Sequence, residues 1–135
     1  MLSDLGKYLS LNIWKHFFYN IFTAIGYKMK KINVKGIKVD KNTRCSHYNS
    51  PVDIIAIKFK CCKQYYACFY CHEEISEHTP QIWNKAEFNT KAVFCGNCNN
   101  EITIHGYLNC KNKCPVCNAN FNPRCSNHHP LYFEK

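Results

Sequence analysis

Residues 95–117 read CGNCNNEITIHGYLNCKNKCPVC, a stretch with two Cys-x₂-Cys pairs that are separated by fifteen residues. Each such turn presents two thiolates about one tetrahedral edge apart, and two turns together complete a closed four-sulfur site. Two redox-active Cys-x-x-Cys pairs are the competing interpretation, but they require a thioredoxin-like βαβ pattern, which this stretch lacks. We therefore expect Cys95, Cys98, Cys114 and Cys117 to bind one Zn²⁺.

The chain before this stretch is denser in the same two residue types. Eight more candidate ligands are Cys45, His47, Cys61, Cys62, Cys68, Cys71, His72 and His78. They suffice for two further tetrahedral sites, so twelve residues would hold three zinc ions with no ligand missing. Adjacent residues on an extended chain point to opposite sides, which allows Cys61 and Cys62, and likewise Cys71 and His72, to serve different metals in interleaved sites. The spacing alone does not assign the eight residues to sites.

The cysteine and histidine content distinguishes this pattern from a disulfide scaffold. The chain has 135 residues, among them 11 Cys and 7 His, and its length fits one domain with an appendage. A secreted disulfide-rich protein would also be rich in cysteine. An odd number of cysteines and the recurrence of His among them argue against it. We expect unpaired, metal-binding cysteines and a cytoplasmic protein.

The positive charge of the chain lies mainly outside the cysteine-rich part. The formal net charge is +9, of which residues 1–44 carry +7 and residues 45–135 only +2. Nine thiolates and three Zn²⁺ would change the second value by −3 and leave the metal-binding part near −1. Since nucleic-acid affinity depends on Lys and Arg that neutralise phosphates, we do not expect nucleic acid as a partner.

Residues 1–28 form an apolar N-terminal extension. Polar residues interrupt the apolar run, which is too polar for a membrane span and lacks the cleavage pattern of a signal peptide. An interfacial helix is an open alternative, so a membrane is expected as a partner only through residues 1–28. Our preferred interpretation is that Met29 is the true start. Residues 29–44 would then be a basic linker or edge segment, and residues 45–133 the zinc-binding domain.

Short strands and little helix are expected between the ligands. Residues 53–60 alternate as a strand does, with Ile55, Ile57 and Phe59 on one face. Residues 92–94 and 101–104 predict two more strands, and residues 73–78 one or two helical turns that end before Pro80. The expected fold is a small, zinc-stabilised, loop-rich α+β domain with zinc knuckles. Aromatic residues should pack between the sites: Tyr65, Tyr66, Phe69, Trp83, Phe88 and Phe94.

The ordered set of metal residues resembles the CHY-type zinc finger over about residues 44–133. It runs Cys45-Ser-His47-Tyr48, Cys61-Cys62, Tyr66, Cys68-x₂-Cys71-His72, His78, Cys95-x₂-Cys98 and Cys114-x₂-Cys117. The resemblance implies that these twelve Cys and His residues are the ligands of three zincs. The ending Phe121-Asn-Pro-Arg-Cys125-x₂-His128 looks like the small single-domain bacterial and fungal members, one of which helps small Tim proteins to assemble. Other relatives are ubiquitin ligases with a following RING domain, for which this chain leaves no room.

Three further residues are candidates for an extra metal or redox site: Cys110, Cys125 and His128. They would form a fourth, partial zinc site, or a reversible Cys110–Cys125 disulfide. The simpler interpretation is that Cys110 is a small buried residue and that the other two stabilise the C-terminal loop.

No catalytic residues are expected. His72-Glu73-Glu74 fits half of the zinc deaminase signature, but the P-C-x-x-C half is absent and twelve ligands would close all three sites. The sequence thus favours a non-enzymatic zinc-binding protein with three structural zincs, a protein-interaction or chaperone-like module with an unidentified protein client. The alternatives are a factor that chelates zinc or exchanges disulfides with clients and, last, a zinc-dependent hydrolase or deaminase.

Overall fold

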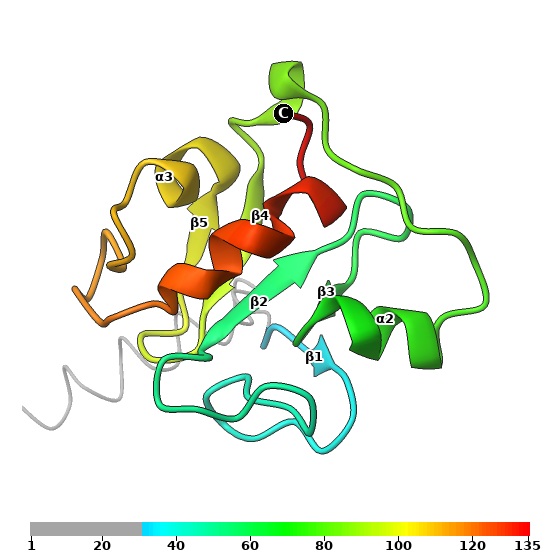
Figure 1. Cartoon of the computed structure of the whole chain (residues 1–135), viewed down its shortest axis with the longest axis horizontal. Coiled ribbons are helices and arrows are strands. Elements are labelled where there is room, and N and C mark those ends of the chain that lie inside the picture. Colours follow the sequence, from blue (N-terminus) through cyan, green and yellow to red (C-terminus); the bar gives the residue numbers. More distant parts are fainter. Residues whose placement is uncertain (1–30) are drawn as a thin grey trace, which may run out of the picture. The chain divides into compact units, whose positions relative to one another are not determined.

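A five-stranded sheet organises the molecule (Figure 1). The computed structural model describes residues 31–135, so the predictions for residues 1–28 lie outside the described residues. The strand order is β1-β3-β2-β4-β5. Only the β1–β3 pair is parallel, and the other neighbours are antiparallel. The strands are β1 (Val34–Lys35), β2 (Ile55–Lys58), β3 (Tyr65–Tyr66), β4 (Lys91–Cys95) and β5 (Glu101–Thr103).

The predicted strands are confirmed, with two local differences. Phe59 lies beyond β2 and packs in a different buried cluster from Ile57. The chain turns at this point, since the Lys63 N–H donates to the Phe59 carbonyl, and the alternation of a strand ends. Ile104 is helical, because the Thr103 hydroxyl accepts from the Gly106 N–H and so caps α3 (Ile104–Leu108).

The main helix, α2 (Phe69–Ile75), begins earlier than the sequence predicts. Cys68 occupies its N-cap, where the sulfur accepts a hydrogen bond from the Cys71 N–H. A cysteine is not among the usual capping residues, and this is why the start was missed. The helix ends at Ile75, and the backbone of its cap residue Ser76 is extended. Residues 76–78, which were expected to be helical, therefore lie beyond the helix, which stops before Pro80.

Two 3₁₀ segments complete the regular structure, η1 (Lys85–Glu87) and η2 (Pro123–Leu131). The sequence predicted neither. The Asn122 side chain caps η2 by accepting from the Arg124 N–H, and it also donates to Asp53 at 2.9 Å. In Figure 1, η2 (orange-red) runs alongside β2 and passes in front of β4. A hollow of about 570 Å³ lies beneath it, lined by residues of β2 and of η2.

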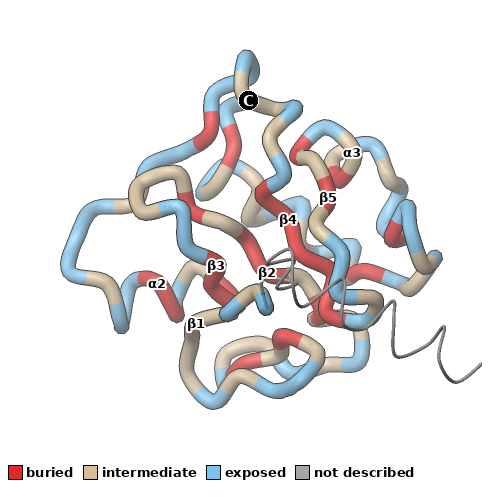
Figure 2. Tube along the Cα trace, turned by 180° about the vertical axis from the view of Figure 1, so that it is seen from behind, coloured by how far each residue is buried: buried red, intermediate tan, exposed pale blue. Residues whose placement is uncertain are grey.

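Zinc-site cysteines belong to both of the larger buried clusters. Ile57, Val93 and Ile104 pack in the same cluster as Cys95 and Cys114. A second cluster places Phe59 and Tyr66 against Cys45, Cys68 and Cys71. Figure 2 shows the burial concentrated along β4 and β3. Of the predicted aromatic core, Tyr65, Tyr66, Trp83 and Phe94 are buried, while Phe69 and Phe88 are half-buried.

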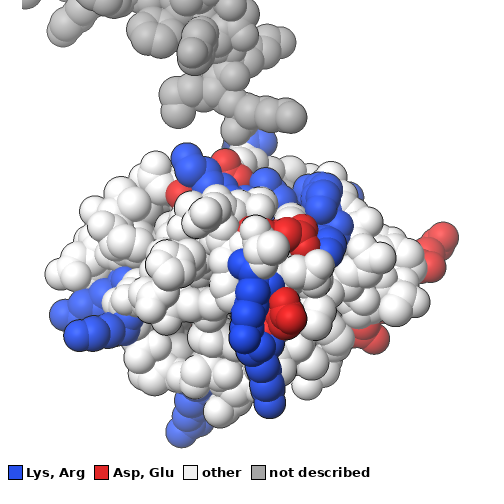
Figure 3. All heavy atoms as spheres, turned by 90° about the horizontal axis from the view of Figure 1, so that it is seen from above, with Lys and Arg blue, Asp and Glu red and all other residues white. Residues whose placement is uncertain are grey.

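Charges of both signs are mixed on the face shown in Figure 3. Lys58 pairs with Glu101 at 3.3 Å, and Lys60 pairs with Glu87 at 2.6 Å. Within residues 31–135, no helix has the length and hydropathy needed to cross a membrane.

Candidate metal centres

The twelve predicted residues come together in three groups of four. In each group the Cys Sγ and His nitrogen atoms all lie within 4.8 Å of one another. Site 1 consists of Cys45, His47, Cys68 and Cys71; site 2 of Cys61, Cys62, His72 and His78; and site 3 of Cys95, Cys98, Cys114 and Cys117. Three four-residue groups with this chemistry support three zinc sites.

Sites 1 and 2 are interleaved along the chain. The neighbours Cys71 and His72 go to different sites, since consecutive residues of α2 point about 100° apart around the helix. Cys61 and Cys62 share site 2, so the suggestion that they serve different metals is wrong. They lie in the turn between β2 and β3, where the backbone is not extended and adjacent side chains need not diverge.

The distances in site 1 match a tetrahedron around zinc. Zinc bonds of about 2.3 Å to sulfur and 2.0–2.1 Å to nitrogen give edges of about 3.8 Å between sulfurs and 3.6 Å between sulfur and nitrogen. The Cys68 sulfur lies 3.6 Å from the sulfurs of both Cys45 and Cys71. His47 Nδ1 lies 3.4 Å from the Cys68 sulfur and 3.5 Å from that of Cys71.

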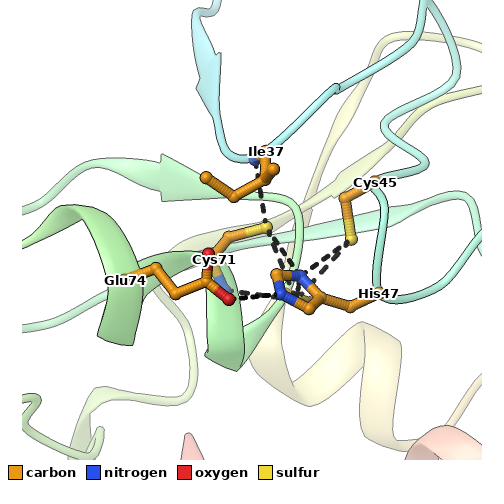
Figure 4. Close-up of polar contacts among 6 residues, drawn as sticks. Ile37, Cys45, His47, Cys71 and Glu74 are labelled. Atoms are coloured by element: carbon orange, nitrogen blue, oxygen red, sulfur yellow. Dashed lines mark hydrogen bonds and ion pairs between the residues drawn. The ribbon is translucent and has the colours of Figure 1, made fainter.

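A carboxylate fixes the ring of His47 from outside site 1. Glu74 Oε1 lies 2.7 Å from Nε2, on the far side of the ring from the sulfurs (Figure 4). This contact holds a proton on Nε2 and leaves the Nδ1 lone pair directed at the centre of the site. The sequence did not identify Glu74 as a partner of His47. Its position three residues after Cys71 on one helix was the signal that could have identified it, because such residues share a face.

Backbone amides also support the sulfurs of site 1. The Ile37 N–H lies 3.4 Å from the Cys71 sulfur, and the Cys71 N–H lies 3.4 Å from the Cys68 sulfur. Hydrogen bonds of this kind stabilise a thiolate. Ile37 lies just after β1, so the edge strand helps to complete the site.

Site 2 joins the β2–β3 turn to α2 and the loop that follows. His72 Nε2 is 3.4 Å from the Cys61 sulfur and 3.2 Å from His78 Nε2. The two sulfurs are 3.9 Å apart. The other ring nitrogen of His72 contacts the Ser76 hydroxyl at 3.2 Å. With Nε2 of both histidines directed inward, the four donors fit one tetrahedral metal.

Site 3 is built from two zinc knuckles. Cys95 ends β4, and the Cys95 and Cys117 sulfurs are 3.8 Å apart. The same distance separates the sulfurs of Cys98 and Cys114. The Val116 N–H and the Asn97 amide donate to the Cys114 and Cys117 sulfurs at 3.4 and 3.3 Å.

Burial and hydrogen bonds shift the pKa values of the thiols in these groups in opposite directions. Burial raises the pKa of Cys68 and Cys95, so without a metal these thiols hold their protons. Burial also opposes ionisation of Cys117, but hydrogen bonds from Asn97 and the Ala119 backbone outweigh it and lower the pKa to about 6. Cys68 and Cys95 would hold Zn²⁺ as thiolates, and a bound Zn²⁺ would supply the charge that stabilises them.

The three additional candidates lie apart from the three groups. Cys110 follows α3 and packs against the main buried cluster. Cys125 and His128 lie on η2, where the ring of His128 is 5.7 Å from that of Tyr48. Within residues 31–135, no group of three or more metal-binding side chains includes them, and no disulfide joins the cysteines.

Comparisons with known proteins agree with this arrangement. The CHY zinc finger pattern matches residues 45–120. An uncharacterized protein of Schizosaccharomyces pombe is 44% identical over 76% of this chain and 89% of its own length. Helper of Tim protein 13 of Kluyveromyces lactis is 40% identical over 79% of this chain and 93% of its own. The protein of the same name in Saccharomyces cerevisiae is 41% identical over 75% of this chain and 90% of its own length.

Proposed function

The chain belongs to the CHY zinc finger family, and on this basis we propose that it is a zinc-stabilised, non-enzymatic protein-interaction module that assists client proteins. Its twelve grouped Cys and His residues are the proposed ligands of three zincs. Four protein ligands per metal leave no open position for substrate or water, which is typical of structural zinc. This closure is the observation that carries the proposal.

The names of two relatives support a role in assisting other proteins. Two of the similar proteins are named as helpers of a Tim protein. We extend that kind of role to this chain: it would bind a protein client and help it reach its assembled form. The client itself is identified only as a protein.

The hollow under η2 is the proposed contact surface for the client. Its lining includes the apolar side chains of Ile55, Ile57 and Ala67 and the aromatic rings of Tyr48 and Tyr132. Its volume of about 570 Å³ lies within the range of ligand-binding pockets. Aromatic and apolar side chains of a partner would be buried there, and such residues dominate interface energetics.

Site-specific photocrosslinking in a reducing extract tests this proposal. A photoreactive residue at Asn127, which is exposed and lines the hollow, should give a discrete crosslinked product with a client. The same residue at Lys91, which is exposed but lies outside the hollow, is the control. Equal crosslinking from both positions, or none from Asn127, would count against a client at this surface.

A second candidate function is zinc handling for client proteins. Site 2 favours it, because His78 is exposed while the ligands of the other two sites are buried or half-buried.

A further inference from the structure

A carboxylate without an ion-pair partner lines the hollow under η2. Asp53 is half-buried, and no salt bridge within residues 31–135 includes it. Burial opposes its ionisation, but hydrogen bonds from the Asn122 side chain and from Ser50 outweigh this and lower the pKa of Asp53. The hollow therefore contains a negative charge that no described side chain pairs with.

The carboxylate of Asp53 can accept further hydrogen bonds. Oδ1 accepts from the Asn122 side chain at 2.9 Å, and Oδ2 accepts from the Ser50 N–H, also at 2.9 Å. A carboxylate has about four lone-pair sites, so part of this capacity remains. Because each oxygen already has one donor, the arrangement suits an ammonium, which needs one oxygen, better than a guanidinium, whose fork engages two.

The hydroxyl of Ser50 is a second polar group that lacks a partner. Its oxygen is buried and makes no hydrogen bond in the described part of the chain. Ser50 lines the hollow and its N–H donates to Asp53, so the hydroxyl lies close to the carboxylate. A buried hydroxyl that has no partner costs free energy, and it gives up no protein hydrogen bond when it turns toward a ligand.

Apolar side chains continue from Asp53 along the same face of the strand β2. Ile55 and Ile57 follow at two-residue spacing, and all three residues line the hollow. Neighbours on one face of a strand are roughly 6.6 Å apart, a distance that a side chain with a long methylene stem can span. The rings of Tyr48 and Tyr132 also line the hollow, and aromatic rings attract cations. This combination fits a methylene chain that ends in a positive charge.

The positive groups near the hollow leave Asp53 without a direct partner. Arg124 lines the hollow but is exposed, so water and salt screen its charge. Arg44 favours the charge of Asp53 through space, but its guanidinium donates to two backbone carbonyls and pairs with Asp40. Burial lowers the pKa of His129, so this ring is uncharged at neutral pH and does not repel a cation.

We propose that the hollow binds a lysine side chain of the protein client, with the ammonium at Asp53 and the methylene stem along β2. This inference rests on the proposed role of the hollow as the contact surface for a client. The Ser50 hydroxyl would accept a second hydrogen bond from the ammonium. A lysine fills only part of a hollow of about 570 Å³, so neighbouring client residues would contact the tyrosine rings.

NMR titration of the full, metal-loaded chain with small probes tests this proposal. Butylammonium has the carbon chain and the charge of a lysine side chain, whereas butanol lacks the charge and methylammonium lacks the stem. We expect butylammonium to shift amide signals around the hollow and to bind about 10-fold more tightly than either comparison probe. Butyrate, which has the opposite charge, should bind most weakly.

Variants of the two polar groups sharpen the test. Ser50→Ala removes a hydroxyl that has no partner, so the spectrum should stay dispersed while butylammonium binds about 5-fold more weakly. Asp53→Asn should abolish the preference for butylammonium over butanol. Glu77→Gln, at an exposed carboxylate outside the hollow, should match the wild type. The comparison of probes on the wild-type chain does not depend on the folding of any variant.

Four results would overturn the assignment of a lysine. They are equal binding of butylammonium and butanol, tighter binding of butyrate, binding of methylammonium as tight as that of butylammonium, and no shift around the hollow. Each leaves the client surface itself in place, because the crosslink from Asn127 tests that surface separately. Absence of the crosslink would refute the client surface, and this inference with it.

Discussion

At the scale of single residues, contacts outside the proposed ligand sets decide how firmly each ligand is oriented. Glu74 shows this most directly, because its carboxylate reaches the ring nitrogen of His47 that faces away from the metal. The side chain of Glu74 is 54% exposed, yet its carboxylate lies 2.7 Å from the His47 ring. Exposure alone therefore does not separate solvated charges from supporting ones on α2.

Removing this carboxylate should weaken site 1 alone. Glu74→Gln keeps the size of the side chain but loses the charged acceptor, and we expect an affinity for zinc about 10–100-fold lower at that site. Competition with a chelator of known affinity measures the change. Glu73→Gln, at the exposed neighbouring residue on the same helix, is the control. If both variants behave alike, Glu74 has no role in positioning His47.

Gly96 illustrates a position where any side chain collides with the backbone. A Cβ built there would lie 2.1 Å from the Asn42 carbonyl oxygen. We expect Gly96→Ala to lower the free energy of unfolding by more than about 3 kcal/mol, since neither backbone segment can move freely. Gly106→Ala, which meets mainly the Thr103 hydroxyl at 3.0 Å, should change stability by at most about 1 kcal/mol. Denaturant titration compares the two, and similar values would refute the close approach.

At the scale of elements, the sequence predicted those that have a periodic pattern or a ligand spacing. The alternation in residues 53–60 predicted β2, whereas the helical turns predicted for residues 73–78 overlap only the end of α2. It did not predict β3, because Tyr65–Tyr66 is too short to show a period. It missed η2 because that segment has no buried residue and depends on Asn122 reaching Asp53, 69 positions away. Long-range contacts of this kind leave no local signal.

The zinc in site 3 should be lost when any one of the four sulfurs is removed. Cys98→Ser removes one of four ligands, and we expect zinc per chain to fall from three to two, with faster amide exchange around residues 95–121. Cys110→Ser is the matched control, because Cys110 belongs to none of the three groups. Mass spectrometry of zinc content and of hydrogen exchange supplies both readouts. Unchanged zinc in Cys98→Ser would rule out the four-sulfur site.

At the scale of the whole molecule, several proposed metal ligands are themselves part of the hydrophobic core. Cys95 and Cys114 pack in the main buried cluster, and Cys45, Cys68 and Cys71 in the second. The twelve residues, their total and the membership of site 3 were visible in the sequence, but the partition of the other eight residues was not. Spacing cannot show that the turn at Cys61–Cys62 directs both sulfurs to one side.

Complete removal of zinc should therefore unfold residues 31–135. Each structural zinc contributes on the order of 10 kcal/mol of apparent binding free energy, comparable with the total stability of a typical domain. We expect a strong chelator to collapse the dispersed amide NMR spectrum, and three equivalents of zinc, added after the chelator is removed, to restore it. A spectrum that stays dispersed after all three metals have been removed would show that the apolar core suffices.

The interleaving of sites 1 and 2 constrains how this domain could be shortened or recombined. Site 3 draws all its members from residues 95–117, so a break in the chain outside this range leaves its metal residues together. Residues 45–78 offer no such cut. Every break between Cys45 and His78 separates members of at least one site, and any break from Cys61 to Cys71 divides both. A gene rearrangement that breaks the chain between Cys61 and Cys71 would therefore lose both sites at once.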